Sequence, residues 1–220
     1  MTSQEKFDLL KKRMASQADP GQAEKMVAYM KNHFDFYGIP AGPRRLIYKD
    51  IIAADKKAKS IDWNLLDLSW ASPKQEMHYF VYDYLRALAK WLSFDHVPKL
   101  LTYVSSNQWW DSIDHFDHIL GNIEDDRRDA FMLELSLSED FWLRRIAIDH
   151  QLGKKDKTKP ELLAAIILNN LGSSEFFINK AIGWSLRDYS KTNPDWVREF
   201  VKEHKKQMAP LSIREASKYI

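Results

Sequence analysis

DFWLRRIAI at residues 140–148 and EFFINKAIG at residues 175–183 share one pattern of side chains. Each begins with an acidic residue and two aromatic residues. An aliphatic, a polar and a basic residue come next. The two stretches lie 35 residues apart, a further step reaches the looser match PLSIREASK at 210–218, and a step back reaches QWWDSIDHFDH at 108–118. A period of this length predicts stacked helix pairs of the HEAT or a related kind, which bury their apolar faces against their neighbours. A chance match between short patterns is the alternative.

The rest of the chain has the pattern of an all-α protein. Apolar residues recur mostly at helical spacing, only seven glycines and eight prolines interrupt them, and no segment alternates like a solvated strand. Helices are expected to begin near Thr2, Gly21, Pro43, Asp62, Pro73, Asp95, Gln108, Asp125, Glu139, Pro160, Ser174, Pro194 and Leu211. We therefore predict an all-α fold, a HEAT-like helical repeat solenoid that forms a single domain over residues 1–220.

The composition limits the class of protein. Hydrophobic residues make up 45% of the chain and charged residues 29%, as in soluble globular proteins. The absence of cysteine excludes disulfides, zinc thiolate sites and a thiol nucleophile. The charged N-terminus MTSQEKFDLLKKRMASQ lacks the apolar stretch of a signal peptide, and no later segment has the length of a membrane span. We therefore predict a cytoplasmic protein.

The charge pattern indicates that any surface for anions is local. The 33 basic and 31 acidic side chains leave a net charge of only +2. Three short basic segments are the candidates: KKR at 11–13, PRR at 43–45 and GKKDKTKP at 153–160. Each of these alone is more typical of an ordinary solvated face.

The stretch QWWDSIDHFDH places tryptophan beside aspartate within one expected helix. At about 100° per residue, one face carries the core side chains Trp109, Ile113, Phe116 and Leu120. The adjacent face carries Trp110, Asp114, Asp117 and Gly121. We therefore expect Trp109 to pack inward, and Trp110 and Asp114, one turn apart, to be presented together.

The 35-residue step predicts a surface that several helices share. It relates Trp110 to Arg145 and Lys180, and Asp114 to Asp149 and Trp184. Lys180, Trp184 and Arg187 also share one face of their own helix. Basic side chains interleaved with aromatic rings suit a nucleic acid, whose phosphates attract the cations and whose bases or sugars meet the rings. In the alternative interpretation both tryptophans are packing residues, Asp114 is solvated and Arg145 pairs with Asp149 one turn later.

A metal site is another chemical interpretation of the same stretch. His115 and His118 are three residues apart and His118 lies one turn from Asp114, but His115 points well round the helix. Asp111 and Asp117 add carboxylates, yet no second cluster of histidine and acidic residues occurs. We therefore predict no metal. The chain also lacks a glycine-rich phosphate loop and a G-x-S-x-G motif, which leaves nucleotide hydrolysis and serine chemistry without support.

Four motifs, YMKNHFDFYGIP at 29–40, WWDSID at 109–114, WLRRIA at 142–147 and EFFINKAIGWSLRDYSKTNP at 175–194, occur in order along the chain. Together they resemble the AlkD family of bacterial DNA alkylation repair glycosylases, and the match extends from about Gln22 to Tyr219. Members of that family are HEAT-like repeat proteins that excise alkylated purines from duplex DNA. The polar residues HFDHIL at 115–120 depart from the family pattern.

The resemblance assigns roles to individual residues. It implies that Asp114 is the catalytic carboxylate and that Trp110 and Trp184 flank the damaged nucleotide. It also implies DNA contacts for three residues: Arg145, which would hold the DNA backbone, and Tyr29 and Arg187.

The chemistry of an alkylated purine fits a single carboxylate. A purine alkylated at N3 or N7 is cationic, so its N-glycosidic bond can break without an acid that protonates the leaving base. Asp114 can then stabilise the sugar cation and position water, while indole faces attract the positive nucleotide. Only Asp117 and His118 lie near enough to serve as an acid, and nothing apolar in DHFDH is expected to raise the pKa of Asp117 sufficiently.

We therefore predict a monomeric, monofunctional DNA glycosylase that releases cationic N3- and N7-alkylated purines from double-stranded DNA in base excision repair, without a cofactor. A concave, locally basic face would bind the DNA and associate the protein with the nucleoid. Its expected DNA contacts are Arg145, Lys180, Arg187 and Tyr29. The alternative is a non-catalytic HEAT-repeat scaffold that binds DNA or protein.

Overall fold

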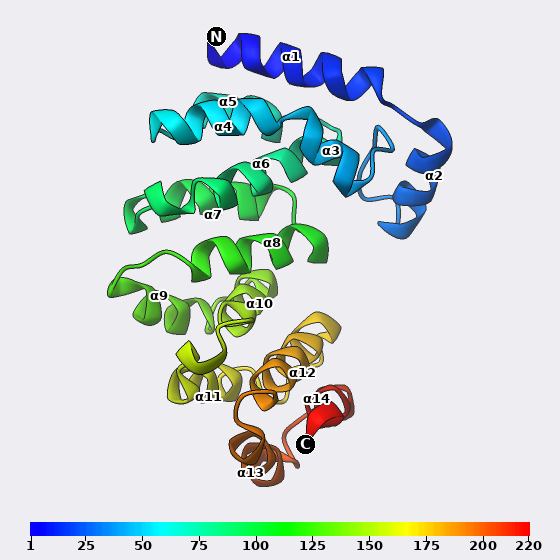
Figure 1. The fold of residues 1–220 in the computed structure, drawn as a ribbon. Helices are drawn as coiled ribbons and strands as arrows, with labels where there is room; N and C mark the ends of the chain where they lie inside the picture. The colour runs from blue at the N-terminus through cyan, green and yellow to red at the C-terminus, as the bar shows by residue number, and fades with distance from the viewer. The chain divides into compact units, whose positions relative to one another are not determined.

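The computed structural model describes residues 1–220, and helices make up its regular structure (Figure 1). Fourteen α-helices and four short 3₁₀ helices follow one another, and the only β-type pairing is an isolated bridge between Asp35 and Lys74. The all-α fold expected from the sequence is confirmed. None of the helices combines the length and the apolar character that crossing a membrane requires.

The chain divides into two compact units, Met1–Leu92 and Ser93–Ile220, which are described one at a time. The single HEAT-like repeat domain over residues 1–220 stays a prediction. The first unit contains α1 Ser3–Ser16, α2 Pro20–Tyr29, α3 Ala41–Ile47, α4 Lys49–Ala58, α5 Trp63–Trp70, α6 Gln75–Ala87 and the 3₁₀ helix Ala89–Trp91.

Most helices of the first unit begin within two residues of the expected positions, but α3 and α4 are two helices where the sequence predicted one. Tyr48 separates them, because its backbone leaves helical geometry at φ −116° and ψ 8°. Its ring packs on Phe80 with the centroids 5.2 Å apart, and its hydroxyl donates to Asp83. The buried aromatic contact therefore fixes the break between the two helices.

A buried carboxylate shapes the loop between α2 and α3. Glu76, on α6, accepts hydrogen bonds from the backbone N–H groups of Tyr37, Gly38 and Ile39 at 2.9, 2.8 and 3.1 Å. Hydrogen bonds of this charge-assisted kind are strong. The motif at 29–40 thus has a structural role of its own, and within it Tyr29, the last residue of α2, is 68% exposed.

Several side chains of the basic segments singled out in the sequence pair with neighbouring groups. Each of three side chains pairs with a carboxylate: Arg13 with Asp50, Arg45 with Asp83, and Lys159 with Asp129. Arg44 is buried, with its guanidinium 4.0 Å from the centroid of the Tyr79 ring. These pairings fit the ordinary interpretation of the three segments.

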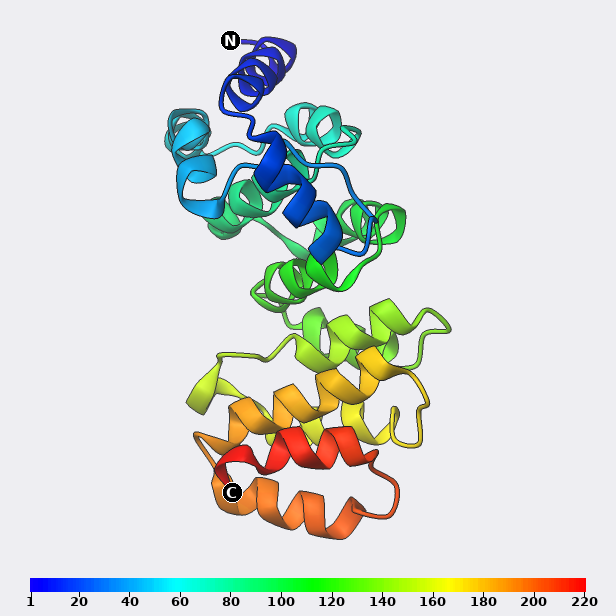
Figure 2. The same ribbon diagram turned by 90° about the vertical axis from the view of Figure 1, so that its right-hand side faces the viewer.

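The second unit stacks its even-numbered helices side by side. It contains α7 Val97–Ser106, α8 Trp110–Gly121, α9 Arg127–Leu135, α10 Phe141–Asp149, α11 Pro160–Leu168, α12 Phe176–Ser190, α13 Pro194–His204, α14 Pro210–Ala216, and the 3₁₀ helices Phe94–His96, Lys155–Lys157 and Ser217–Tyr219. Helix α8 packs against α10, α10 against α12, and α12 against α14 (Figure 2).

The 35-residue step holds for α10 and α12 but not for α8. The residues before these two helices, Asp140 and Glu175, are 35 positions apart, whereas Trp109, before α8, lies only 31 positions before Asp140. The segment between α8 and α10 is shorter because the loop before α9 is shorter than the loop before α11. The expected equivalence of Asp114 with Asp149 is therefore wrong by about one helical turn, and Asp114 corresponds to Arg145.

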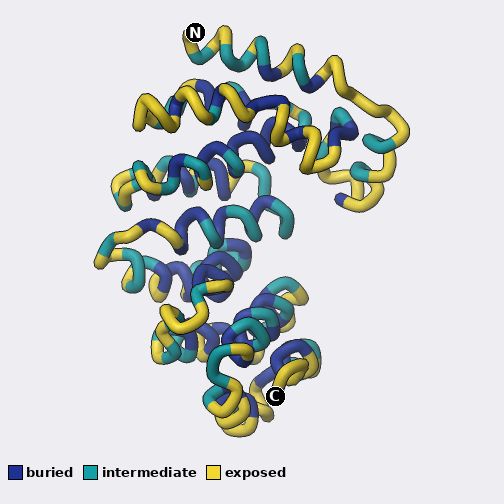
Figure 3. The backbone as a smooth tube through the Cα atoms, viewed as in Figure 1, coloured by how far each residue is buried: buried dark blue, intermediate teal, exposed yellow.

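Two glycines allow the close approach of neighbouring segments in this stack. A Cβ atom at Gly121 would lie 2.3 Å from the backbone oxygen of His150, and one at Gly183 would lie 2.5 Å from Cβ of Glu215. Buried residues run along α8, α10 and α12 (dark blue in Figure 3). The end of α8 that carries Gly121 is therefore packed against His150, the residue that follows α10.

Candidate active site

Aromatic contacts hold the start of α8. Trp109 is extended, at φ −156° and ψ 157°, and Trp110 is the first helical residue. The ring centroid of Trp109 lies 6.2 Å from that of Trp142 and 5.8 Å from that of Phe177. Trp109 therefore packs inward as expected, although it is the N-cap residue and not a member of the helix. The other three members of the stripe are buried as expected: Ile113, Phe116 and Leu120.

Asp114 is bound by a buried arginine from the next helix of the stack. Nε and Nη2 of Arg145 donate to the same oxygen, Oδ1 of Asp114, at 2.9 and 2.7 Å, and Nη1 donates to the backbone oxygen of Phe177 at 2.7 Å. No protein group donates to Oδ2 of Asp114. Arg145 is 1% exposed, whereas the side chain of Asp114 is 27% exposed. One carboxylate oxygen is thus fixed, and the other can accept a hydrogen bond from a bound molecule.

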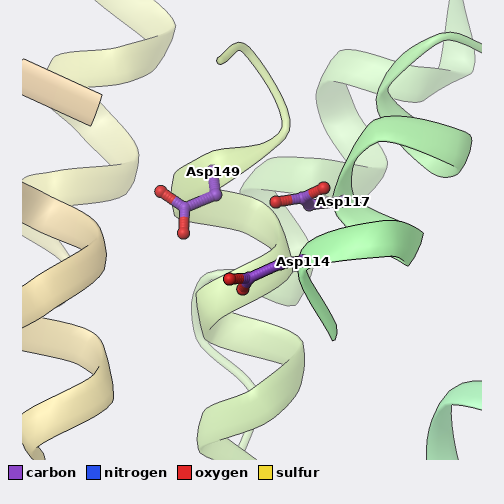
Figure 4. Close-up of side chains that lie close together, drawn as sticks. All are labelled: Asp114, Asp117 and Asp149. Carbon is purple, nitrogen blue, oxygen red and sulfur yellow. The ribbon is translucent and has the colours of Figure 1, made fainter. Parts of the chain in front are cut away.

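Two further carboxyl groups lie beside this pair. Figure 4 shows Asp114 and Asp117 on α8 and Asp149 on α10, and each residue offers an oxygen within 4.8 Å of the others. Asp117 and Asp149 are buried. The Ser185 hydroxyl donates to Oδ1 of Asp149 at 2.9 Å, and Nη2 of Arg145 lies 3.6 Å from Oδ2. Two of these three neighbouring carboxyl groups, Asp114 and Asp149, therefore share one guanidinium.

Burial changes the acidity of all three groups. It raises the pKa of Asp117 well above its ordinary value, the charges of Asp149 and Asp114 raise it further, and Arg145 acts in the opposite direction. Burial also raises the pKa of Asp149, to about 6, against the opposing charge of Arg145. The pKa of Asp114 is raised by burial, while Arg145 and His118 oppose the change. The sequence-based expectation that nothing would raise the pKa of Asp117 is wrong, because packing against α10 removes the side chain from water.

Trp184 lies among three cations. The guanidinium of Arg145, the ammonium of Lys180 and the guanidinium of Arg187 lie 5.4, 5.3 and 5.9 Å from the centroid of its ring. The indole is partly buried. The face that Lys180, Trp184 and Arg187 were expected to share is therefore present in the structure, and Arg145 approaches it from α10.

One carboxylate organises the cations of this face. Glu215, on α14, accepts hydrogen bonds from Lys180 at 2.9 Å, from Arg187 at 2.7 Å and from Lys218 at 2.7 Å. Hydrogen bonds from Lys218 and Lys180 hold the pKa of Glu215 at about 2. The side chains of Lys180 and Arg187 are 25% and 27% exposed. A single negative charge faces three positive ones, so the cluster keeps an excess of positive charge at the surface.

Comparison with known protein families identifies the family of this chain. Residues 10–220 match the family described as DNA alkylation repair enzyme. The chain belongs to the DNA alkylation repair enzyme family. A solved structure described as a predicted DNA alkylation repair enzyme from Enterococcus faecalis is similar, at 36% sequence identity and a TM-score of 0.84, over 93% of this chain and 97% of that chain. No functionally curated protein matches the sequence.

In this DNA alkylation repair enzyme, the second unit holds most of the residues that the sequence singled out. Asp114 and Arg145 are in direct contact, and Lys180 and Arg187 meet at Glu215. Trp110 is the partly buried first residue of α8, one turn before Asp114. Tyr29 belongs to the first unit.

Sequence reasoning missed Glu215 and Lys218. One signal was available, because a step of 35 residues from Lys180 ends on Glu215, and the two side chains do form an ion pair. The equivalence of the two positions was missed because position 215 carries an acidic residue where position 180 carries a basic one. Lys218 carried no signal apart from its place one turn after Glu215.

The metal interpretation takes a different form in the structure of this family member. The three residues that could offer oxygen ligands are Asp114, Asp117 and Asp149, without a histidine. Arg145 already places a cation 2.7 Å from Asp114 and 3.6 Å from Asp149. A divalent ion would compete with that guanidinium for the same oxygens, so the cluster favours an arginine-centred arrangement over a metal centre.

Proposed function

We propose that this protein is a monofunctional DNA glycosylase that hydrolyses the N-glycosidic bond of cationic N3- and N7-alkylated purines in duplex DNA. The observation that supports the proposal is the geometry of Asp114. Arg145 binds one oxygen of this carboxylate, the other oxygen accepts no hydrogen bond from the protein, and the side chain reaches the surface.

The reaction needs a negative charge and a proton acceptor. The bond between C1′ and the purine nitrogen breaks, its electron pair leaves with the cationic base, and the base departs as a neutral molecule. The positive charge that develops on the sugar is stabilised by the carboxylate of Asp114. A water molecule adds to C1′ and gives its proton to Asp114, so the products are a free base, an abasic site and one proton. Burial raises the pKa of Asp114, and Arg145 opposes this shift and so favours the ionised form that the chemistry requires.

The two tryptophans take different parts in this proposal. The ring of Trp184 already interacts with Arg145, Lys180 and Arg187, so an incoming cationic nucleotide would compete with them. We assign to Trp184 the ordering of these cations beside the DNA backbone, next to the nucleotide. Trp110, one turn from Asp114, is then the indole that meets the positive nucleotide directly.

Arg145 acts through Asp114 in this proposal. A phosphate contact would require its buried guanidinium to leave Asp114 and the backbone oxygen of Phe177. Phosphates are instead bound by the cations that meet at Glu215, of which Lys180 and Arg187 are partly exposed and Lys218 is exposed.

Release of cationic purines is expected to exceed release of neutral ones by at least about a hundredfold, because a missing general acid typically costs that much for a neutral leaving group. The measurement is single-turnover release of 7-methylguanine, 3-methyladenine and hypoxanthine from matched duplexes. Similar rates for hypoxanthine and 7-methylguanine would show that an acid protonates the base. Tight DNA binding without release of any base would instead support the non-catalytic scaffold.

Removing one cation at Glu215 is expected to weaken DNA binding equally for all sequences. Lys180→Ala and Arg187→Ala should each reduce the slope of log affinity against log salt by roughly 1, because one phosphate contact is lost. Titration of duplex DNA at several salt concentrations measures the slope. Lys202→Ala is the matched control, because Lys202 lies on α13 and pairs with Glu199. An unchanged slope in both test variants would place the phosphate contacts elsewhere.

A further inference from the structure

Asp114, Asp117 and Asp149 form a cluster of three carboxyl groups around the cation Arg145. If all three were ionised, the charges of the cluster would not balance, and two of the carboxylates would be buried. Burying unpaired charge is costly, and a carboxyl group normally takes up a proton instead. The cluster is therefore expected to hold at least one proton.

The hydrogen-bond donors around each group indicate where that proton lies. Asp114 accepts two N–H groups of Arg145, and Asp149 accepts the hydroxyl of Ser185 beside the same guanidinium. Donors of this kind favour the ionised form of a carboxyl group. Asp117 accepts only the backbone N–H of the residue that follows it, and it pairs with no cation. It is the member of the cluster best suited to carry the proton.

Asp149 lacks a hydrogen-bond donor for one of its oxygens. Its Oδ2 is buried and accepts no hydrogen bond, although Nη2 of Arg145 lies 3.6 Å away. A buried acceptor without a donor costs free energy. Asp117 offers an oxygen within 4.8 Å of an oxygen of Asp149, so a proton on Asp117 would supply the missing donor after a small side-chain adjustment.

We propose that Asp117 is a neutral carboxylic acid that donates a hydrogen bond to Asp149 and thereby positions Arg145 on Asp114. Asp117 is a positioning residue, because it is buried and acts on the reaction through the other three side chains. Its part in catalysis rests on the proposed function, whereas its protonation can be measured without any activity.

The charged groups around Asp117 determine what its ionisation would do. Asp114 and His118 lie on its own helix, and α10 contributes Asp149 and Arg145. Helix α7, which also packs against α8, buries only one titratable side chain, that of Tyr103. An ionised Asp117 would compete for Arg145 and weaken its hold on Asp114. Base release should therefore decline at alkaline pH.

Protein stability tests the protonation state directly through Asp117→Asn. The folded wild-type protein keeps a proton on Asp117 that the unfolded chain loses above the ordinary pKa of aspartate. The contribution of this side chain to stability is therefore full at low pH and is lost as the pH rises. Asparagine carries no such proton, so the variant should gain stability relative to wild type as the pH rises from the ordinary pKa of aspartate to neutrality, by up to about tenfold in the folding equilibrium constant per pH unit.

The matched control is Asp195→Asn, at a carboxylate whose side chain is 89% exposed. Its stability relative to wild type should not vary with pH over the same range. If the ratio for Asp117→Asn is equally flat, Asp117 is ionised in the folded protein and the proposal is overturned.

A second measurement uses the wild-type protein, so it does not depend on whether a variant folds. In wild-type protein labelled at the carboxyl carbons of aspartate, carbon NMR at about neutral pH should contain one resonance in the region of neutral carboxylic acids, since ordinary aspartates are ionised there. Where Asp117→Asn folds, that resonance should be missing from its spectrum. The absence of such a resonance from wild type overturns the proposal.

Base release tests the positioning role. The rate for wild type should fall at least about threefold as the pH rises from neutral into the alkaline range, and the decline should be missing in Asp117→Asn, which has no group to ionise. Asp117→Leu, which cannot donate to Asp149, should release base about tenfold more slowly than Asp117→Asn. Equal rates for these two variants would exclude the hydrogen bond. If wild type releases no base while the stability and NMR results hold, the proposed function fails and the proton on Asp117 stands.

Discussion

Replacing Asp114 with asparagine is expected to lower base release from alkylated DNA by at least about a hundredfold, which corresponds to about 3 kcal/mol of barrier. The amide preserves the shape of the side chain, and its oxygen can still accept a hydrogen bond from Arg145. It removes the negative charge that stabilises the sugar cation and the group that accepts the proton of water. Single-turnover release of 7-methylguanine measures the effect.

Asp111→Asn is the control for this experiment, because Asp111 lies on the same helix, one turn nearer its start. Both variants should keep the fold and a DNA affinity close to that of wild type, because Arg145 retains Asp149 as a counter-charge in Asp114→Asn. Release by Asp114→Asn at a rate near that of wild type would refute the assignment of Asp114 as the catalytic carboxylate.

Replacing Arg145 with methionine is expected to reduce the free energy of unfolding by about 3 to 5 kcal/mol, the usual effect of removing one partner from a buried ion pair. The loss would leave Asp114 and Asp149 without their shared cation. Urea denaturation at neutral pH measures it. The deficit should shrink as the pH falls, because Asp114 and Asp149 become protonated and no longer need a counter-charge.

Two comparison variants make this second prediction specific. Arg145→Lys keeps the charge but cannot reproduce three N–H bonds in a fixed plane, so its stability should lie between those of wild type and Arg145→Met. Arg198→Met removes an exposed pair with Asp195 and should change stability very little. A deficit for Arg145→Met that does not vary with pH would mean that lost packing, and not unpaired charge, destabilises the variant.

The sequence was sufficient for the fold class and for much of the candidate site. Helix starts follow from local signals such as the side chains of Asp62 and Asn193, which cap their helices, and Pro194 at a first helical position. Periodicity also placed Lys180, Trp184 and Arg187 on one face, because that relation lies within a single helix.

Relations between helices were less predictable. The step from α8 to α10 depends on loop length, so a fixed period displaced Asp114 by about one turn relative to Arg145. The burial of Asp117 follows from the approach of α10 near Gly121, which an inspection of the stretch at 108–118 alone does not reveal. The packing of a neighbouring helix, which propensity does not encode, decides whether a polar side chain faces water or a carboxylate.

The guanidinium of Arg145 ties together three helices. It belongs to α10, binds α8 through Asp114, and binds α12 through the backbone oxygen of Phe177. The orientation of the candidate catalytic carboxylate is thus a cooperative property of the stack. Partial opening that detaches α12 would release one arm of the arginine and loosen Asp114 while α8 stays folded. Substitutions at the contact between α10 and α12 can therefore abolish activity although they touch neither Asp114 nor DNA. A native-like helix content alone does not show that the site is intact.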